Sequence, residues 1–243
     1  MRGRYLERKA KERRSTPRRR MDTLRILATG FSAFPRAPVN PTEELMGMLA
    51  EAAPDLGPAV ELRTLVLPVE YARAPQALAE LGTMFAADVA VHFGLADTAR
   101  GFRLESTARN RSSMLAADAA GLLPVQPRVC EGPATLRSTL PLREIAAALA
   151  AEGLPVQLSS NAGAYLCNHV FYLSRSCAIS RFGPAMSGFV HVPFLDDQLE
   201  AIQPSRAGRL FAMTRADLLK GAIAILRVCA AHASHLPTRS SGP

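Results

Sequence analysis

Cys167 lies where the sequence predicts that a tight turn enters a helix. Residues 155–159 alternate apolar and polar side chains as a short strand does, and residues 161–163 form a turn of small residues. From Cys167 onward, apolar residues recur at the spacing of one helix face. Unpaired backbone N–H groups and the helix dipole favour an anion at such an N-terminus, so a thiolate is stabilised there. The stretch predicts a cysteine nucleophile, and the alternative for this segment alone is a buried structural cysteine.

Three histidines are candidates for the base that a cysteine nucleophile needs. His92 lies in the middle of an apolar strand, and His169 follows Cys167 by two residues, which in a helix points it to another face. His191 lies between two valines in a later strand, and the two remaining histidines lie near the C-terminus. A histidine in an apolar strand is more typical of a core residue than of a base. Spacing alone therefore does not select one of the three.

Glu105 is the candidate for the group that orients a catalytic histidine. It lies next to an apolar residue just after a predicted strand, where a carboxylate can be half-buried and hydrogen-bonded to an imidazole. The alternative is a surface glutamate that pairs with Arg103 or Arg109. If a protonated histidine faces Cys167 in a water-filled cleft, the imidazolium and the helix dipole outweigh burial. We then expect a thiol pKa below the roughly 8.5 of a free cysteine.

The elements that must position these residues alternate between strands and helices. In the first hundred residues the predicted elements are 23–29, 41–53, 60–67, 71–85 and 88–93. The first, third and fifth are strands, and Gly94 closes the last of them. Strands separated by helices of ten or more residues predict parallel βαβ units, whose sites gather at the carboxyl ends of the strands. We predict one α/β domain, a three-layer α/β/α sandwich with a mostly parallel central sheet.

The second half of the chain continues this pattern after one interruption. Residues 106–137 predict an excursion from the sheet in the form of a hairpin. A helix follows from Pro141, with Gly153 at its C-terminal cap. Residues 187–194 then predict a late apolar strand, and 215–231 predict the terminal helix.

Composition indicates a globular protein without a membrane span. The 243 residues suffice for one domain with a sizeable core, and 48% of them are hydrophobic at a mean hydropathy of +0.06. The four cysteines show no C-x-x-C spacing and form a poor disulfide framework, so we expect a cytoplasmic protein. Histidines and cysteines do not cluster as metal ligands, so neither a metal nor a cofactor is predicted.

The net charge of +8 belongs to the N-terminal arm, residues 1–20. This arm holds ten Lys and Arg residues against two Glu residues, so residues 21–243, the predicted domain, are neutral. An apolar signal segment is absent from the arm. We expect the arm to be a disordered appendage that takes no part in the chemistry. If the protein binds nucleic acid, we expect it to do so only through this arm. The alternative is a start placed upstream of the true one, because Met21 opens directly onto the first strand.

Several motifs together resemble the pyroglutamyl-peptidase I (pyrrolidone-carboxylate peptidase) family of cysteine peptidases. The most specific are A-G-x-Y-x-C-N around Cys167 and G-F-x-H-V-P around His191. The matching stretches, in the family's order, are 28–31 with Phe34, 39–41, 92–96 with Glu105, 138–141, 161–168 and 187–193. It is their co-occurrence, not any single strand, that favours Cys167 and His191 over the alternatives above.

This resemblance implies a function and a site. The family's triad carries over onto Glu105, Cys167 and His191, and its enzymes remove an N-terminal pyroglutamyl residue from peptides through an acyl-enzyme. A pocket for the lactam ring is implied near four apolar residues, Phe31, Phe34, Leu95 and Leu166. The resemblance also implies an α/β/α sandwich without a cofactor, and we expect a homo-oligomer.

One departure from the family leaves rival functions open. Many members carry an arginine, thought to assist the oxyanion, at the place of Leu115. Either Arg109 or Arg111 replaces it, or backbone N–H groups act alone; losing one such donor typically costs on the order of 10²–10³ in rate. The rivals are therefore a weak or inactive homologue that serves as a binding module, its arm contacting nucleic acid, and a nucleoside phosphorylase-like enzyme. The second lacks a glycine-rich phosphate loop.

Overall fold

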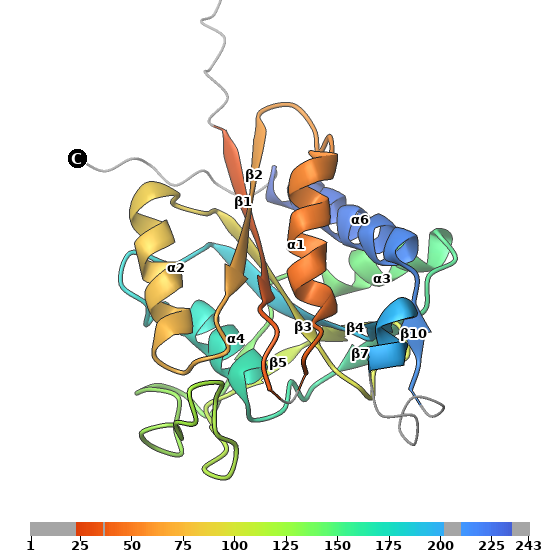
Figure 1. Cartoon of the computed structure of the whole chain (residues 1–243). Coiled ribbons are helices and arrows are strands. Elements are labelled where there is room, and N and C mark those ends of the chain that lie inside the picture. The colour runs from red at the N-terminus through yellow and green to blue at the C-terminus, as the bar shows by residue number, and fades with distance from the viewer. Residues whose placement is uncertain (1–22, 36, 202–209, 235–243) are drawn as a thin grey trace, which may run out of the picture.

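A six-stranded sheet lies at the centre of the computed structural model, which describes residues 23–35, 37–201 and 210–234 (Figure 1). Its spatial order is β2-β1-β3-β8-β4-β7. The strands are β1 (Leu24–Phe31), β2 (Val60–Leu67), β3 (Val89–Leu95), β4 (Phe102–Glu105), β7 (Val156–Ser159) and β8 (Met186–Val192). All neighbours pair in parallel except β4 and β8, which are antiparallel. The predicted mostly parallel sheet is confirmed.

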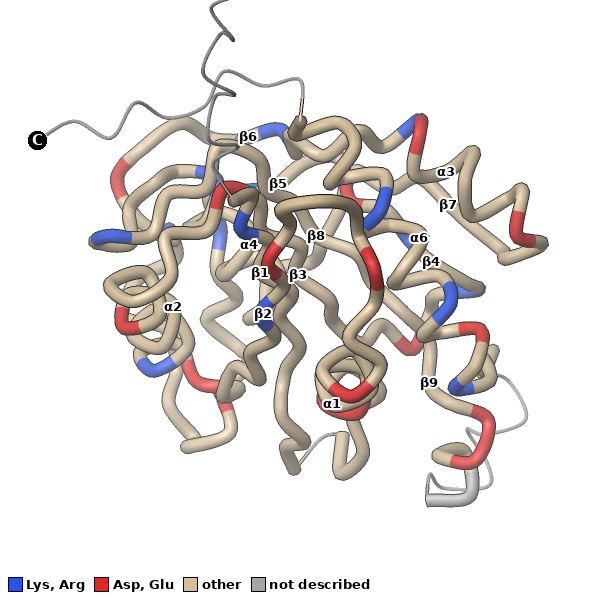
Figure 2. The backbone as a smooth tube through the Cα atoms, turned by 90° about the horizontal axis from the view of Figure 1, so that it is seen from above, with Lys and Arg blue, Asp and Glu red and all other residues tan. Residues whose placement is uncertain are grey.

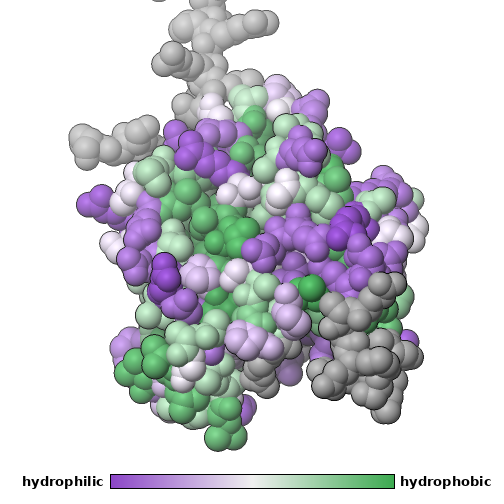
Figure 3. Space-filling view, viewed as in Figure 1, coloured by the Kyte–Doolittle hydropathy of each residue, from purple (hydrophilic) through white to green (hydrophobic). Residues whose placement is uncertain are grey.

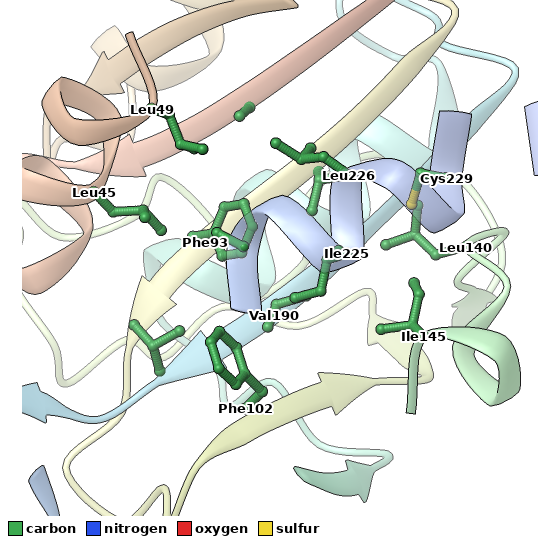
Figure 4. Packing of buried hydrophobic residues seen from close by; sticks show 14 of the residues in the cluster. Leu45, Leu49, Phe93, Phe102, Leu140, Ile145, Val190, Ile225, Leu226 and Cys229 are labelled. Carbon is green, nitrogen blue, oxygen red and sulfur yellow. The ribbon is translucent and has the colours of Figure 1, made fainter. Parts of the chain in front are cut away.

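Helices cover both faces of this sheet. On one face pack α1 (Pro41–Ala52), α3 (Leu142–Ala151) and α6 (Arg215–Ala233), whose apolar residues share a core cluster with Phe93 and Val190 (Figures 1 and 4). On the other face α2 (Arg73–Met84) and α4 (Leu166–Ser176) build a second cluster around Phe189. Burial on both faces explains why β3 and β8 are nearly continuous apolar runs. The three layers are those that the sequence predicts.

The N-terminus of α1 fixes the loop that follows β1. The Asn40 side chain accepts a hydrogen bond from the Thr42 N–H at 3.1 Å, and Pro41 is the first residue of the helix, as predicted. Thr42 in turn accepts the Phe31 N–H at 2.9 Å, and Glu43 accepts the Ala33 N–H at 2.7 Å. The end of β1 at Phe31 and the loop after it, which carries Phe34, are therefore hydrogen-bonded to the start of α1.

Several element boundaries differ from the sequence prediction, each by one or two residues. Gly94 does not close the third strand, because β3 continues through it to Leu95 and pairs Gly94 with His191. Helix α2 begins at Arg73, two residues later than predicted. Inside the strand, the glycine's lack of a side chain permits a close approach of the Cys167 sulfur.

The predicted excursion is confirmed as a pair of short antiparallel strands, β5 (Thr107–Arg109) and β6 (Thr135–Arg137), with a long loop between them. Asp118 anchors the loop, since its carboxylate accepts the N–H groups of Tyr71, Ala120 and Leu122. Figure 3 shows apolar side chains on the loops at the lower left of the molecule, where Figure 1 draws this segment. The exposed apolar residues of the loop are Met114, Leu115, Leu122, Leu123 and Val125.

Three short elements complete the described fold: β9 (Phe194–Leu195), the 3₁₀ turn η1 (Asp197–Ala201) and β10 (Ala212–Met213), which pairs with β9. Acidic and basic residues are interspersed over the described backbone (Figure 2). The predicted arm, residues 1–20, lies outside the described residues. Among the described helices, none combines the length and the apolar character that crossing a membrane requires.

Candidate active site

Strands β4 and β8 bring Glu105 and His191 together. His191 Nδ1 lies 2.8 Å from Glu105 Oε1, and both side chains are almost completely buried. The antiparallel register sets Glu105 beside Phe189 and Arg103 beside His191. Because residues two apart in a strand share a face, all four side chains gather on one face of the sheet. The two residues are 86 positions apart in sequence, so the sheet topology alone makes them neighbours.

Glu105 has further partners that hold it as a carboxylate. Its Oε1 accepts Arg103 Nε–H at 2.9 Å, and its Oε2 accepts the backbone N–H of Asn161 at 3.2 Å. Burial by itself raises the pKa of this carboxyl, but hydrogen bonds from His191 and Ser159 and the charge of Arg103 outweigh it, so the pKa is lowered. An ionised Glu105 is an acceptor only. The His191 Nδ1–H therefore donates to it, which leaves His191 Nε2 as the free acceptor.

Cys167 lies on the same face of the sheet as His191. It is the second residue of α4, which Tyr165 caps in extended conformation. A methyl group on Gly94 would lie 2.9 Å from Cys167 Sγ, and Gly94 is the partner of His191 in the parallel β3–β8 pairing. Residues paired in this way project to one face, so the sulfur and the imidazole occupy neighbouring positions above the sheet. Glycine at position 94 is what leaves room for the sulfur.

The resting site is electrically neutral at the thiol and the imidazole. Although Cys167 is partly exposed as a residue, its sulfur packs against the sheet, and burial raises the pKa of the thiol to about 12. Glu105 raises this pKa further, whereas the cysteine's own backbone N–H and Arg103 lower it. Burial also lowers the pKa of His191, with Arg103 acting in the same direction and Glu105 against it. The prediction of a lowered thiol pKa is wrong, because burial outweighs the helix N-terminus.

The other candidate histidines are core residues. His92 is fully buried with its Nδ1 2.8 Å from Thr29 Oγ1, and burial lowers its pKa to about 3. His169 lies 3.3 Å from Ser112 Oγ through its Nδ1, and burial lowers its pKa to about 4. The described residues contain no group of His, Cys, Asp and Glu side chains that could hold a metal ion.

Asn168 is the last residue of the motif around Cys167, and the structure gives it a role that the sequence does not indicate. It is fully buried, accepts the Arg109 N–H at 2.8 Å, and donates to the Arg109 and Arg111 carbonyls at 2.8 and 2.9 Å. Ser113 N–H also donates to the Ala164 carbonyl at 2.7 Å. These hydrogen bonds attach the excursion, residues 106–137, to the start of α4 and to the turn that precedes Cys167. The available signal was a polar residue directly after the nucleophile on an otherwise apolar helix face.

The four apolar residues expected around the substrate have unequal surroundings. Phe31 and Leu166 are buried in the cluster around Phe189, and the Phe31 and Phe189 ring centroids lie 6.4 Å apart. Phe34 is partly exposed, with its ring centroid 6.2 Å from that of Tyr165. Leu95 is partly exposed at the carboxyl end of β3. Tyr165, next to the nucleophile, is an aromatic neighbour that sequence reasoning did not single out.

Leu115 lies away from the interior, with 95% of its surface exposed. Of the two arginines considered as substitutes, Arg109 donates from Nη2 to the Ser160 carbonyl at 3.3 Å, in the turn before Cys167, and Arg111 is exposed. Arg103, which sequence reasoning treated only as a surface partner of Glu105, is the arginine that contacts the Glu105–His191 pair.

Comparison with known proteins shows which proteins this chain is similar to. A family model described as pyroglutamyl peptidase matches residues 24–229. The pyrrolidone-carboxylate peptidase of Pyrococcus furiosus is 34% identical over 177 residues, 72% of this chain and 84% of the relative. Pyrrolidone-carboxylate peptidase 1 of Ralstonia nicotianae is 35% identical over 186 residues, 75% and 85% of the two chains. The crystal structure of the pyrrolidone carboxyl peptidase of Fervidobacterium islandicum superposes with a TM-score of 0.77 at 30% identity, covering 84% and 97%.

Proposed function

Because the chain belongs to the pyroglutamyl peptidase family, we propose that it hydrolyses the bond after an N-terminal pyroglutamyl residue of peptides, with Cys167, His191 and Glu105 as its catalytic triad. The observation that carries the triad is the 2.8 Å contact of His191 with Glu105 on the sheet face that also holds the Cys167 sulfur. This arrangement supports Cys167 as nucleophile, His191 as base and Glu105 as orienting group.

Acylation begins from a neutral thiol and a neutral imidazole. As Cys167 Sγ attacks the pyroglutamyl carbonyl, His191 Nε2 takes the thiol proton, and the C–S bond forms while the carbonyl oxygen becomes an oxyanion. Glu105 stabilises the imidazolium that this transfer creates. The intermediate then collapses to a thioester, and His191 gives its proton to the leaving amine of the shortened peptide.

Deacylation repeats these roles with water as the nucleophile. His191 Nε2 takes a proton from the water as its oxygen attacks the thioester carbonyl. Collapse of the second intermediate breaks the C–S bond, releases pyroglutamate and returns the proton to the sulfur. The site is therefore restored to its neutral resting state without an external reactant other than water.

The oxyanion is held by backbone N–H groups at the start of α4 in this proposal. The first N–H groups of a helix lack intrahelical partners, and Cys167 is the second residue of α4. A hydrogen bond from the Cys167 N–H also lowers the pKa of its own thiol, in support of a donor at this end of the helix. Leu115 points away from the interior, so an arginine at its place is not required for this arrangement.

Substitution of the nucleophile tests the function. Cys167→Ala should lower kcat/KM on a pyroglutamyl fluorogenic amide by at least about 10³-fold, because a covalent route loses its nucleophile. Cys177→Ala is the matched control, since Cys177 is exposed at the far end of α4 and should keep full activity. Equal activity of Cys167→Ala and the natural protein would rule out the proposed nucleophile, and absence of activity in the natural protein would favour the binding-module alternative.

A further inference from the structure

Arg103 is inserted into the contact between Glu105 and His191. Its Nε–H donates to Glu105 Oε1 at 2.9 Å, the same oxygen that accepts His191 Nδ1–H at 2.8 Å. Its Nη2 lies 3.4 Å from His191 Nδ1, and its Nη1 donates to Thr98 Oγ1 at 3.1 Å. The Arg103 side chain is 20% exposed, so its charge is only partly screened by solvent. Two hydrogen bonds, to Glu105 and to Thr98, therefore hold a permanent cation beside the Glu105–His191 pair.

The Arg103–His191 distance does not describe a hydrogen bond between them. His191 Nδ1 carries the proton donated to Glu105, and a guanidinium N–H can only donate, so two donors face one another. When His191 becomes an imidazolium, that approach turns into repulsion between two cations. Glu105, moreover, gives one oxygen to both partners, so part of its charge is already neutralised before His191 accepts a proton.

We propose that Arg103 is a positioning residue that keeps His191 neutral, and so able to act as a base, at lower pH than a His–Glu pair without the arginine. It does so by sharing Glu105 Oε1 and by repelling the imidazolium. This inference rests on the proposed function of the triad and deepens it. Arg103 is not an oxyanion donor, since it meets the imidazole at Nδ1 and not at the Nε2 that serves Cys167.

The other titratable groups around His191 do not reproduce this effect. Helix α4 presents Cys167, whose raised thiol pKa keeps it uncharged below pH 8. Strand β3 presents His92 behind the Phe189 ring, and its pKa of about 3 keeps it neutral in the working range. Asp97 is an exposed residue of the loop that contacts Arg103 through Thr98, so solvent screens its charge. Within the part of the chain that the structure describes, Glu105 and Arg103, both from β4, are the charged groups in contact with His191.

The test compares the pH dependence of kcat/KM in the natural protein, Arg103→Met and Arg103→Lys. Loss of the cation should move the acidic limb of Arg103→Met upward by about half a pH unit or more, a part of the ~1–3 units that a close charge produces when buried. Arg103→Lys should keep the limb nearer to that of the natural protein. Arg100→Met is the matched control, because it removes an exposed arginine of the neighbouring loop and should not move the limb.

A second readout does not depend on activity. The His191 ring signals are titrated by NMR in Cys167→Ala with and without Arg103→Met, and the midpoint should rise by a similar amount when Arg103 is absent. Coinciding midpoints in folded proteins would overturn the proposal, as would a uniform loss of kcat/KM at every pH without movement of the limb. Failure of both Arg103 variants to fold would also overturn it, because Arg103 would then serve the fold. An inactive natural protein with shifted midpoints would reject the function and not the role of Arg103.

Discussion

At the scale of single residues, the Cys167 thiol and the His191 imidazole are both neutral at rest. Their charges therefore form only during the reaction. Burial raises the pKa of the Cys167 thiol, and burial lowers that of His191. Glu105, by contrast, remains a carboxylate through its hydrogen bonds and Arg103. The positive end of α4 and a protonated His191 would stabilise a thiolate, but the sulfur is packed against the sheet, so desolvation outweighs them. In the proposed mechanism His191 therefore acts as a general base in the attack step.

This electrostatic state predicts how Cys167 reacts with an alkylating agent. Alkylation requires the thiolate, so its rate with iodoacetamide should stay low at pH 7 and rise only above the roughly 8.5 of a free thiol. Glu105 raises the thiol pKa through its charge, so Glu105→Gln should move the alkylation midpoint downward or leave it in place. The same variant should lower kcat, because it removes the stabilisation of the imidazolium.

Measurement of the pH–rate profile at Cys167 by peptide mapping checks this directly. Cys177, exposed at the C-terminal end of α4, is the solvent-accessible thiol that serves as the comparison in the same sample. A Cys167 midpoint well below that of Cys177, moved upward by Glu105→Gln, would show a resting ion pair. The neutral resting state would then be wrong.

At the scale of secondary-structure elements, the sequence predicts the alternation better than the contacts between elements. Apolar runs and capping residues predict β1, β2, α1 and α6 closely, because these features are local along the chain. The prediction that Gly94 ends the third strand is wrong. A glycine is needed there to leave room for the sulfur of Cys167, which is 73 residues away in the sequence. Pairing of β4 with β8, which joins Glu105 to His191, has no local signal in either strand.

The site residues show the same contrast between local patterns, which the sequence reveals, and long-range contacts, which it does not. Cys167 and its helix follow from local spacing, whereas His191 emerged from three histidines only through a family resemblance. The role of Arg103 depends on an antiparallel register, and that of Asn168 on a loop 57 to 59 residues away. Long-range pairing is decided by the whole sheet, so single-sequence patterns do not reach it.

The clamp between α4 and the excursion gives a prediction at this scale. Asn168→Ala should lower the free energy of unfolding by roughly 1–3 kcal/mol, because it removes a buried side chain and leaves partly buried backbone groups of Arg109 and Arg111 without their partner. It should also lower kcat/KM, since the turn before Cys167 loses its anchor. Denaturant unfolding and the fluorogenic assay measure the two effects.

Asn110→Ala is the matched control for that clamp. Asn110 is also a buried asparagine that bonds backbone groups, Val129 N–H and the Cys130 carbonyl, but it holds the far end of the same loop. Both variants should lose stability, and Asn168→Ala should lose more activity for the same loss of stability. Equal losses of activity would mean that the loop as a whole, and not its link to α4, supports the site.

At the scale of the whole molecule, the charge and the chemistry are separable along the chain. The ten basic residues of the arm account for the net charge of +8, and the family match begins at residue 24. The contacts described for the proposed triad join residues of the described fold. We therefore keep the expectation that the arm takes no part in the reaction.

A protein that starts at Met21 should consequently keep its solubility and its kcat/KM within about twofold, because the triad contacts among the described residues are retained. Its affinity for a double-stranded DNA oligonucleotide, if the full chain has any, should disappear with the arm. The paired measurement is the fluorogenic assay and a fluorescence-anisotropy titration on both proteins. A large loss of kcat/KM in a soluble, folded protein would connect the arm to the site.

The central claim is that Cys167 carries the pyroglutamyl group during turnover, and trapping that species tests it most directly. The natural protein is mixed with a pyroglutamyl ester or amide, quenched in acid within one turnover, digested and analysed by mass spectrometry. We predict one pyroglutamyl acyl group on the peptide that contains Cys167, lost on incubation at neutral pH and absent from Cys167→Ala. Turnover with no acyl group on Cys167, or with the acyl group on another of the four cysteines, would contradict the account.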